Sequence, residues 1–234
     1  MDVRIIYEDN HLLVTEKPVN IPVQEDSSRD CDLLSILRND IKIRYNKPGN
    51  VFLALVHRLD RPVGGVMVFA KTSKAASRLS DSFRKQEIER SYLAVVRGCP
   101  PEKYGLLEHY LLKNRRKNIV HVVPEDTKHA KKAVLEYEVL DETDDLGLLS
   151  VKLHTGRSHQ IRVQLSTSGY PIYGDQKYGR HVNKLGEQIA LWSHKLTLLH
   201  PVKKEPMTFI SLPPEKYPWT LWTDFLRKNN QPVM

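Results

Sequence analysis

The chain has 234 residues, of which 40% are hydrophobic and 27% are charged, values typical of a globular protein with one large domain or two closely joined subdomains. Its 36 Lys and Arg residues outnumber its 28 Asp and Glu residues, and the formal net charge of +8 favours a polyanionic partner without requiring one. No segment approaches the length of a membrane-spanning helix, so we expect no membrane partner.

Cysteine and histidine usage bears on redox compartment and metal binding. Cys31 and Cys99 are the only cysteines, too few and too far apart for a disulfide framework or a zinc site. The ten His residues show no metal-ligand spacing, so we expect no metal. Reduced thiols, together with an N-terminus that lacks an apolar signal core, predict a cytoplasmic protein.

The first half of the chain reads as strands and helices with clear boundary signals. A strand pair, a helix that begins at an Asp N-cap, and a second helix capped by Thr or Ser are all visible in the periodicity. The expected elements are a hairpin with strands at 3–7 and 12–16, a helix beginning at Asp30 or Asp32, buried strands within 55–70, a helix from 72 to about 85, and a strand at 89–98.

The second half begins with the least regular and most basic region, residues 103–132, in which Lys113, Arg115, Arg116 and Lys117 lie close together. This run is either a solvated hairpin surface or an RNA-facing loop. The elements expected after it are antiparallel strands at 134–139 and 148–153, a helix capped by Ser158, strands at 189–194 and 206–210, and a closing helix at 219–227. Strands with helices between them predict a mixed α+β domain around one long sheet.

A short polar turn within residues 55–70 is the first candidate for chemistry. It places Asp60 between Arg58 and Arg61, at the end of an apolar run and before Pro62 and two Gly residues. One interpretation is a surface ion pair of little energetic value. The other is a carboxylate that neighbouring guanidinium groups keep ionised, which could act as a nucleophile or electrostatic stabiliser but is a poor general acid.

Four segments together resemble the pseudouridine synthases of the RluA type, and the likeness extends over nearly the whole chain. Each segment alone is a moderate signal, whereas four in the same order and spacing are a strong one. The segments are Tyr7-Glu8-Asp9-Asn10-His11-Leu12-Leu13-Val14-Thr15-Glu16-Lys17-Pro18, His57-Arg58-Leu59-Asp60 with Gly65 and Ala70-Lys71, Arg90 to Gly98, and Thr155-Gly156-Arg157-Ser158-His159-Gln160-Ile161-Arg162-Val163 followed by Gly169 to Asp175 and Tyr178-Gly179.

The chain departs from the family pattern in three ways. Val63-Gly64-Gly65 stands where the family usually has Thr-Ser-Gly, and these positions shape the turn rather than carry the chemistry. Ser158 stands where Thr is more usual. Many relatives carry a small RNA-binding domain before the first motif, and we expect none here, so that residues 1–234 form a single catalytic domain.

The resemblance implies an RNA pseudouridine synthase, an isomerase that needs no cofactor. In the family, a catalytic Asp attacks the target uridine, the glycosidic bond breaks, the uracil rotates, and a C–C bond forms. Asp60 stands where that Asp would be, Tyr92 would stack on the base and help remove the C5 proton, and Arg162 would keep Asp60 ionised.

The resemblance also implies an RNA site and a fold. The target base must be flipped out of the RNA, and Arg58 would fill the vacated stack. The residues expected to contact RNA are Arg58, Arg61, Arg157, His159 and Leu191. The expected fold is α+β, with a bent, mostly antiparallel sheet, flanking helices and a central RNA-binding cleft.

The substrate and some alternatives stay open at this point. The RNA could be ribosomal or transfer RNA, and we expect a monomer with no protein partner. A catalytically inactive RNA-binding protein would share the charge and the fold. A hydrolase would need a second carboxylate beside the scissile bond, and none stands in the matching motifs. A structural ribosome-associated module would need no catalytic acid.

Overall fold

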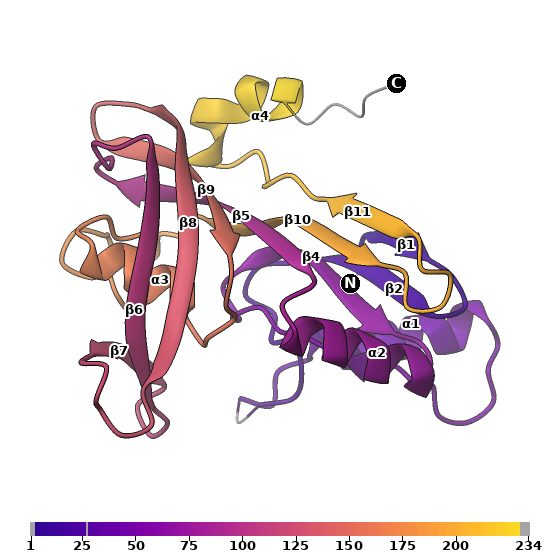
Figure 1. The fold of residues 1–234 in the computed structure, drawn as a ribbon. Helices are drawn as coiled ribbons and strands as arrows, with labels where there is room; N and C mark the ends of the chain where they lie inside the picture. The colour runs from indigo at the N-terminus through magenta and orange to yellow at the C-terminus, as the bar shows by residue number, and fades with distance from the viewer. Residues whose placement is uncertain (1–2, 27, 230–234) are drawn as a thin grey trace. The chain divides into compact units, whose positions relative to one another are not determined.

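The computed structural model describes residues 3–26 and 28–229 and divides the chain into two compact units (Figure 1). Unit 1 comprises the chain up to Glu89 together with Ser193–Ser211, and unit 2 comprises Arg90–Trp192 together with the chain from Leu212 onward. A single catalytic domain over residues 1–234 stays a prediction. In the part of the chain that the structure describes, no helix has the length and apolar character needed to cross a membrane.

Four strand pairs of unit 1 are antiparallel, namely β1–β2, β2–β4, β3–β4 and β10–β11. Neighbouring strands follow the order β1, β2, β4, β10, with β3 paired to β4 and β11 paired to β10. The predicted hairpin at the start of the chain is confirmed, as are the two late strands. The bounds are β1 Ile5–Glu8, β2 Leu12–Lys17, β3 Ala54–Leu55, β4 Gly64–Ala70, β10 Leu191–Leu199 and β11 Pro206–Ile210.

Two helices of unit 1 begin at the predicted caps. α1 spans Leu33–Arg44, and the carboxylate of Asp32 accepts a hydrogen bond from the backbone N–H of Ser35 at 3.0 Å. α2 spans Ser73–Arg84, and Thr72 caps it. The helices and strands bury a hydrophobic core, whose members include Leu12, Val14, Val66, Val68, Ala70, Ala75, Leu79, Ile88, Leu196, Leu198 and Phe209.

The expectation of buried strands on both sides of the Asp60 turn is only half right. The first apolar run contributes just the two residues of β3, and residues 56–63 form a loop. Gly64 and Gly65, interpreted as turn residues, already belong to the fully buried strand β4. An apolar run alone does not distinguish a strand from a buried loop.

Unit 2 contains a five-stranded antiparallel arrangement in the order β5, β9, β8, β6, β7. The strands predicted at 89–98, 134–139 and 148–153 are confirmed, but the expectation that 103–132 is the least regular region is wrong. That region is mostly a long hairpin of β6 and β7. The bounds are β5 Glu89–Arg97, β6 Tyr104–Asn114, β7 Ile119–Val123, β8 Lys131–Glu142 and β9 Leu146–Leu153.

The helical segments of unit 2 are short. α3 spans Gln160–Thr167, the 3₁₀ segment η1 spans Trp219–Trp222, and α4 spans Thr223–Asn229. The predicted cap of α3 is wrong, because His159 rather than Ser158 occupies the N-cap position, with left-handed backbone (φ 52°) and no side-chain capping bond. The mixture of antiparallel strands with flanking helices confirms the α+β class.

Candidate active site

The predicted site residues are distributed over both units, and each unit holds a group of them. Those in unit 1 are Arg58, Asp60 and Arg61, and those in unit 2 are Tyr92, Arg157, His159, Arg162 and Leu191. Among residues 3–26 and 28–229, no three His, Cys, Asp or Glu side chains are grouped so that they could hold a metal ion.

Asp60 is half-buried in the loop between β3 and β4. A turn fixes the backbone there, because the N–H of Val63 donates to the carbonyl of Asp60 at 3.0 Å. Leu59, next to it, is buried and anchors the loop in the apolar interior. A carboxylate on a loop held in this way has a defined orientation, as a reactive group requires.

Lys17, at the end of β2, holds the same loop from within. Its side chain is 0% exposed, and its ammonium donates to the carbonyls of Pro18 (2.9 Å), Arg61 (2.9 Å) and Val63 (2.7 Å). The last two carbonyls belong to residues that closely follow Asp60 in sequence, so one side chain fixes the segment immediately after that residue. Burial lowers the pKa of Lys17 to about 7, an effect that the negative charge of Asp60 opposes.

Gly65 in β4, where the chain keeps the glycine of the family pattern, is required for physical reasons. Its φ is +114°, and a Cβ atom there would lie 2.2 Å from the backbone oxygen of Ser193 in β10. The hydroxyl of Ser193 donates to the carbonyl of Val66 at 3.0 Å. Glycine is therefore required at 65, whereas position 64 carries no such constraint in the backbone dihedrals.

The two arginines beside Asp60 have different environments. Arg58 is exposed, and within the described residues no hydrogen bond or ion pair engages its side chain, which argues against its being simply the ion-pair partner of Asp60. Arg61 instead binds the preceding loop: Nε donates to the carbonyl of Asn20 at 3.1 Å, Nη1 to the hydroxyl of Ser28 at 3.1 Å, and Nη2 forms an ion pair with Asp30.

Arg162 in α3 forms a buried bidentate ion pair with Asp175. Nε and Nη2 donate to the two carboxylate oxygens, each at 2.8 Å. Burial alone would raise the pKa of Asp175, but the hydrogen bonds and charge of Arg162, with the backbone N–H groups of Lys177 and Tyr178, keep that pKa below its usual range. Asp175 is thus an anion that orients the guanidinium.

Tyr178 connects several segments of unit 2 around this pair. Its hydroxyl accepts from the backbone N–H of Val120 in β7 at 2.8 Å and lies 2.7 Å from Nδ1 of His159. The guanidinium of Arg162 lies 5.3 Å from the centre of its ring. His159, which we expected to contact RNA, is buried, and it orients Tyr178 in the described structure.

The loop before α3 is held by its own side chains and by the basic hairpin. The backbone N–H of Arg157 donates to Oε1 of Gln160 at 2.9 Å, and its Nε donates to the carbonyl of Lys132 at 2.9 Å. Ser158, instead of capping the helix, accepts a hydrogen bond from Nζ of Lys113 at 3.0 Å. The β6–β7 hairpin is therefore fixed to the loop that carries Arg157.

Tyr92 and Leu191 lie in strands of the core. Tyr92 is in β5, opposite Val151 of β9, and is 7% exposed. Leu191 is the first residue of β10 and is buried. Burial is compatible with a wall of an apolar pocket as well as with packing, so the role of each stays a prediction.

Sequence reasoning missed three residues that shape the site. The three residues are Lys17, Asp175 and Tyr178, and all of them stand inside the segments that carry the family resemblance. A Lys immediately before Pro at the end of a buried strand was the available signal for Lys17. Asp175 stands at the end of a turn-rich segment, residues 169–175, and its sequence alone is that of an ordinary surface turn.

Comparison with known proteins identifies the class. The sequence profile of a family described as RNA pseudouridylate synthase matches residues 11–167, more than half of the chain, and includes the Asp60 loop. The chain belongs to the RNA pseudouridylate synthase family. The resemblance drawn from the four motifs is confirmed at the level of the family.

Curated relatives agree with this assignment. A protein of Aquifex aeolicus named as an uncharacterized RNA pseudouridine synthase is 33% identical over 229 residues, covering 92% of this chain and 71% of that protein. The ribosomal large subunit pseudouridine synthase C of Buchnera aphidicola is 36% identical over 199 residues, covering 84% of this chain. The chain spans 60% of the length of that relative.

Solved structures agree on the fold. Human RNA pseudouridylate synthase domain containing 4 matches with a TM-score of 0.77 at 24% identity, covering 90% of this chain and 88% of that one. The related human domain containing 1 matches with a TM-score of 0.73 at 22% identity, covering 92% and 85%. Family, relatives and fold together support the activity of an RNA pseudouridine synthase, an isomerase.

Proposed function

We propose that this chain converts a specific uridine of a structured RNA to pseudouridine, with Asp60 as the residue that attacks the nucleotide. The observation that carries the proposal is the family match through the loop of Asp60, combined with the way Lys17 fixes the segment that follows Asp60. A reactive carboxylate is effective when its surroundings hold it in one geometry before substrate binds.

Tyr92 and Arg162 complete the proposed catalytic group. Tyr92 stacks on the target uracil and helps remove the proton from C5 in the last step. Arg162 stabilises the ionised form of Asp60, because a guanidinium close to a carboxylate favours its charged state.

Arg58 is proposed to take the place of the flipped base. Extrusion of a base costs a few kcal/mol, and a planar guanidinium that stacks in the gap offsets part of that cost. The exposure of Arg58 and the absence of a hydrogen bond or ion pair to its side chain among the described residues support this role.

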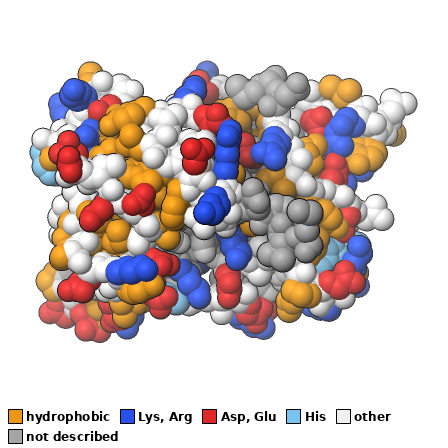
Figure 2. Space-filling model, turned by 90° about the horizontal axis from the view of Figure 1, so that it is seen from above, with side chains coloured by type: hydrophobic (Ala, Val, Ile, Leu, Met, Phe, Trp, Pro, Cys, Tyr) orange, Lys and Arg blue, Asp and Glu red, His pale blue; other side chains and the backbone are white. Residues whose placement is uncertain are grey.

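The substrate we propose is ribosomal RNA of the large subunit, with transfer RNA as the alternative. Several curated relatives carry the large ribosomal subunit in their names. On the face drawn in Figure 2, Lys and Arg side chains are interspersed with Asp and Glu rather than gathered into one basic patch. Phosphate contacts scattered in this way position a folded RNA without reading its sequence.

The proposed function includes no cofactor or metal, because the reaction is redox-neutral and transfers no group to another molecule. We further propose a cytoplasmic monomer without a protein partner. The competing hydrolase would need a second carboxylate able to donate a proton. Asp175 does not fit that role, because its lowered pKa keeps it ionised.

The test is release of tritium from RNA labelled at uridine C5, measured separately on ribosomal and transfer RNA. We expect release from the ribosomal pool with the unaltered protein. With Asp60→Asn we expect a loss of at least about a thousandfold, because the variant keeps the shape of the side chain but not the nucleophile. RNA binding by Asp60→Asn should stay within about threefold of the unaltered protein.

Asp81→Asn is the matched control, since Asp81 is an exposed carboxylate on α2 of the same unit. It should keep full activity. Tritium release that persists in Asp60→Asn would refute the role of Asp60. Tight, salt-sensitive RNA binding without any release by the unaltered protein would favour the inactive RNA-binding alternative.

A further inference from the structure

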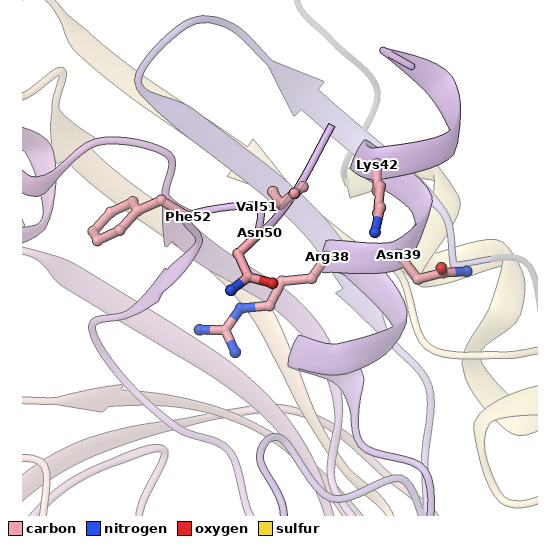
Figure 3. A pocket seen from close by; sticks show the side chains of 7 residues that line it. Arg38, Asn39, Lys42, Asn50, Val51 and Phe52 are labelled. Atoms are coloured by element: carbon pink, nitrogen blue, oxygen red, sulfur yellow. The ribbon is translucent and has the colours of Figure 1, made fainter. Parts of the chain in front are cut away.

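A pocket of about 650 Å³ lies on the outer side of α1 in unit 1 and is separate in sequence from the family motifs (Figure 3). Arg38 and Lys42, one helical turn apart, supply its positive charge, while Leu37 and Ile41 on the inner side of the same helix are buried. The residues that line the pocket are Arg38, Asn39, Lys42, Gly49, Asn50, Val51 and Phe52.

The polar groups of this pocket are available to a ligand. Arg38 uses Nη2 to donate to the carbonyl of Leu53 at 2.9 Å, which fixes the guanidinium at the pocket wall. Among residues 3–26 and 28–229, no hydrogen bond or ion pair engages the side chains of Asn39, Lys42 or Asn50. The nearby Asp40 is paired with Arg44, so it does not neutralise these cations.

An exposed aromatic ring stands next to the charged groups. Phe52 is 52% exposed, although a Phe ring in contact with water is unfavourable in the free protein. In Figure 3 the side chains of Arg38 and Asn50 overlap in the view, and the ring of Phe52 extends away from both. The cations suit a phosphate, the amide suits the polar edge of a base, and the exposed ring suits the face of a base.

We propose that this pocket binds a single-stranded nucleotide of the substrate RNA, outside the nucleotide that reacts. Arg38 and Lys42 bind its phosphate, Asn50 contacts a polar edge, and the base stacks on Phe52. Phe52 and Asp60 are eight positions apart in the sequence, so they lie at most about 29 Å from one another. One RNA can reach both within a few nucleotides.

This proposal rests on the proposed function for its ligand, and its first test is a direct one. Phe52→Trp places an indole at the pocket, and the three native tryptophans, Trp192, Trp219 and Trp222, are all buried. A short single-stranded oligouridylate should quench the new fluorescence, whereas the same concentration of inorganic phosphate should not. Leu199→Trp is the control, because Leu199 is comparably exposed, at 59%, and lies elsewhere in unit 1.

The second test uses activity on the RNA pool that supports tritium release. Phe52→Ala should raise KM about tenfold with little change in kcat, because loss of one stacked base weakens binding but not chemistry. Lys42→Ala should lower the slope of log Kd against log salt by about one. Leu199→Ala and Lys74→Ala, at exposed positions of the same unit, should change neither quantity.

The outcomes separate this inference from the proposed function. If the unaltered protein forms pseudouridine but Phe52→Ala and Lys42→Ala behave like their controls, the pocket proposal is overturned and the function stands. If no RNA releases tritium, the proposed function fails, and quenching of Phe52→Trp by oligouridylate still supports the pocket. Equal quenching at positions 52 and 199, or quenching by phosphate alone, would refute a nucleotide site.

Discussion

Lys17, Arg162 and Asp175 are charged side chains that the fold removes almost entirely from water, with exposed fractions of 0%, 6% and 1%. A buried charge is tolerated only when partners satisfy it, and here the partners are three carbonyls in one case and an opposite charge in the other. At the scale of single residues, these three buried charges, which cost free energy to desolvate, therefore lie at or next to the predicted catalytic side chains.

Asp175→Asn should strongly destabilise unit 2 and reduce activity. The substitution leaves Arg162 buried without its counter-charge, a change that costs about 3–5 kcal/mol in comparable buried pairs. Chemical denaturation and tritium release would measure the two effects. Glu187→Gln is a suitable comparison, because the Arg97–Glu187 pair of the same unit is more exposed, and it should lose less stability. Equal losses of stability in the two variants would contradict the idea that burial makes the Arg162–Asp175 pair more important.

Lys17 should make the stability of the protein depend on pH in a defined window. Its pKa is about 7 in the folded state and about 10.4 in an unfolded chain, so unfolding between these values takes up a proton. The contribution of Lys17 to the free energy of unfolding therefore rises as the pH increases from 7 towards 10.4.

Urea denaturation of the unaltered protein and of Lys17→Met at pH 7 and pH 9 would measure this contribution. The stability difference in favour of the unaltered protein should be larger at pH 9. Lys74→Met, at an exposed position of α2, should show no such pH dependence. A difference between the unaltered protein and Lys17→Met that stays constant with pH would contradict the lowered pKa.

At the scale of elements, the strands β4 and β10 approach more closely at Gly65 than any side chain would permit. Two independent constraints select glycine at this position: its φ is positive, and its Cα lies too close to the backbone of Ser193 to leave room for a Cβ atom. The strand that follows the Asp60 loop is thereby fixed at its first residues, which also fixes where the loop ends.

Gly65→Ala should destabilise the protein by about 3 kcal/mol or more, the sum of an unfavourable φ and a steric clash. Gly186→Ala provides a matched control, because Gly186 also has positive φ (+91°) but no atom within 4 Å of a Cβ built there. It should lose only about 1–2 kcal/mol. Thermal denaturation of both variants would measure the difference, and equal losses would show that the contact with Ser193 relaxes at no cost.

The elements that sequence predicted well are those with local signals. Asp32 and Thr72 cap helices that begin where expected, and the hairpin at the start of the chain follows from β-forming residues around a polar turn. A hairpin was one of the two interpretations of the basic run, but the strands β6 and β7 were not located, because apolar residues stand on both faces: Leu106 is 60% exposed, whereas Leu111 is buried. Pairing with β8 decides its conformation, and that is a long-range effect.

At the scale of the whole molecule, the motifs predicted the family and named candidate residues in both units, but they did not predict partners. The side chain of Arg162 binds Asp175, and that of Arg61 binds the 20–30 loop. The partner of a side chain depends on which segments the tertiary fold brings together, and a single sequence does not show those long-range contacts. The net charge of +8 likewise gave a partner class but not a binding face.

The attachment of the basic hairpin has a consequence for how this chain can vary over evolution. Val120 is held through Tyr178, Lys113 through Ser158, and the carbonyl of Asn118 accepts a hydrogen bond from Lys177. The turn at 115–117 lies beyond these contacts and is exposed. Insertions and deletions should therefore accumulate in that turn without disturbing α3, so that RNA preference can diverge there while the residues around Arg162 stay the same.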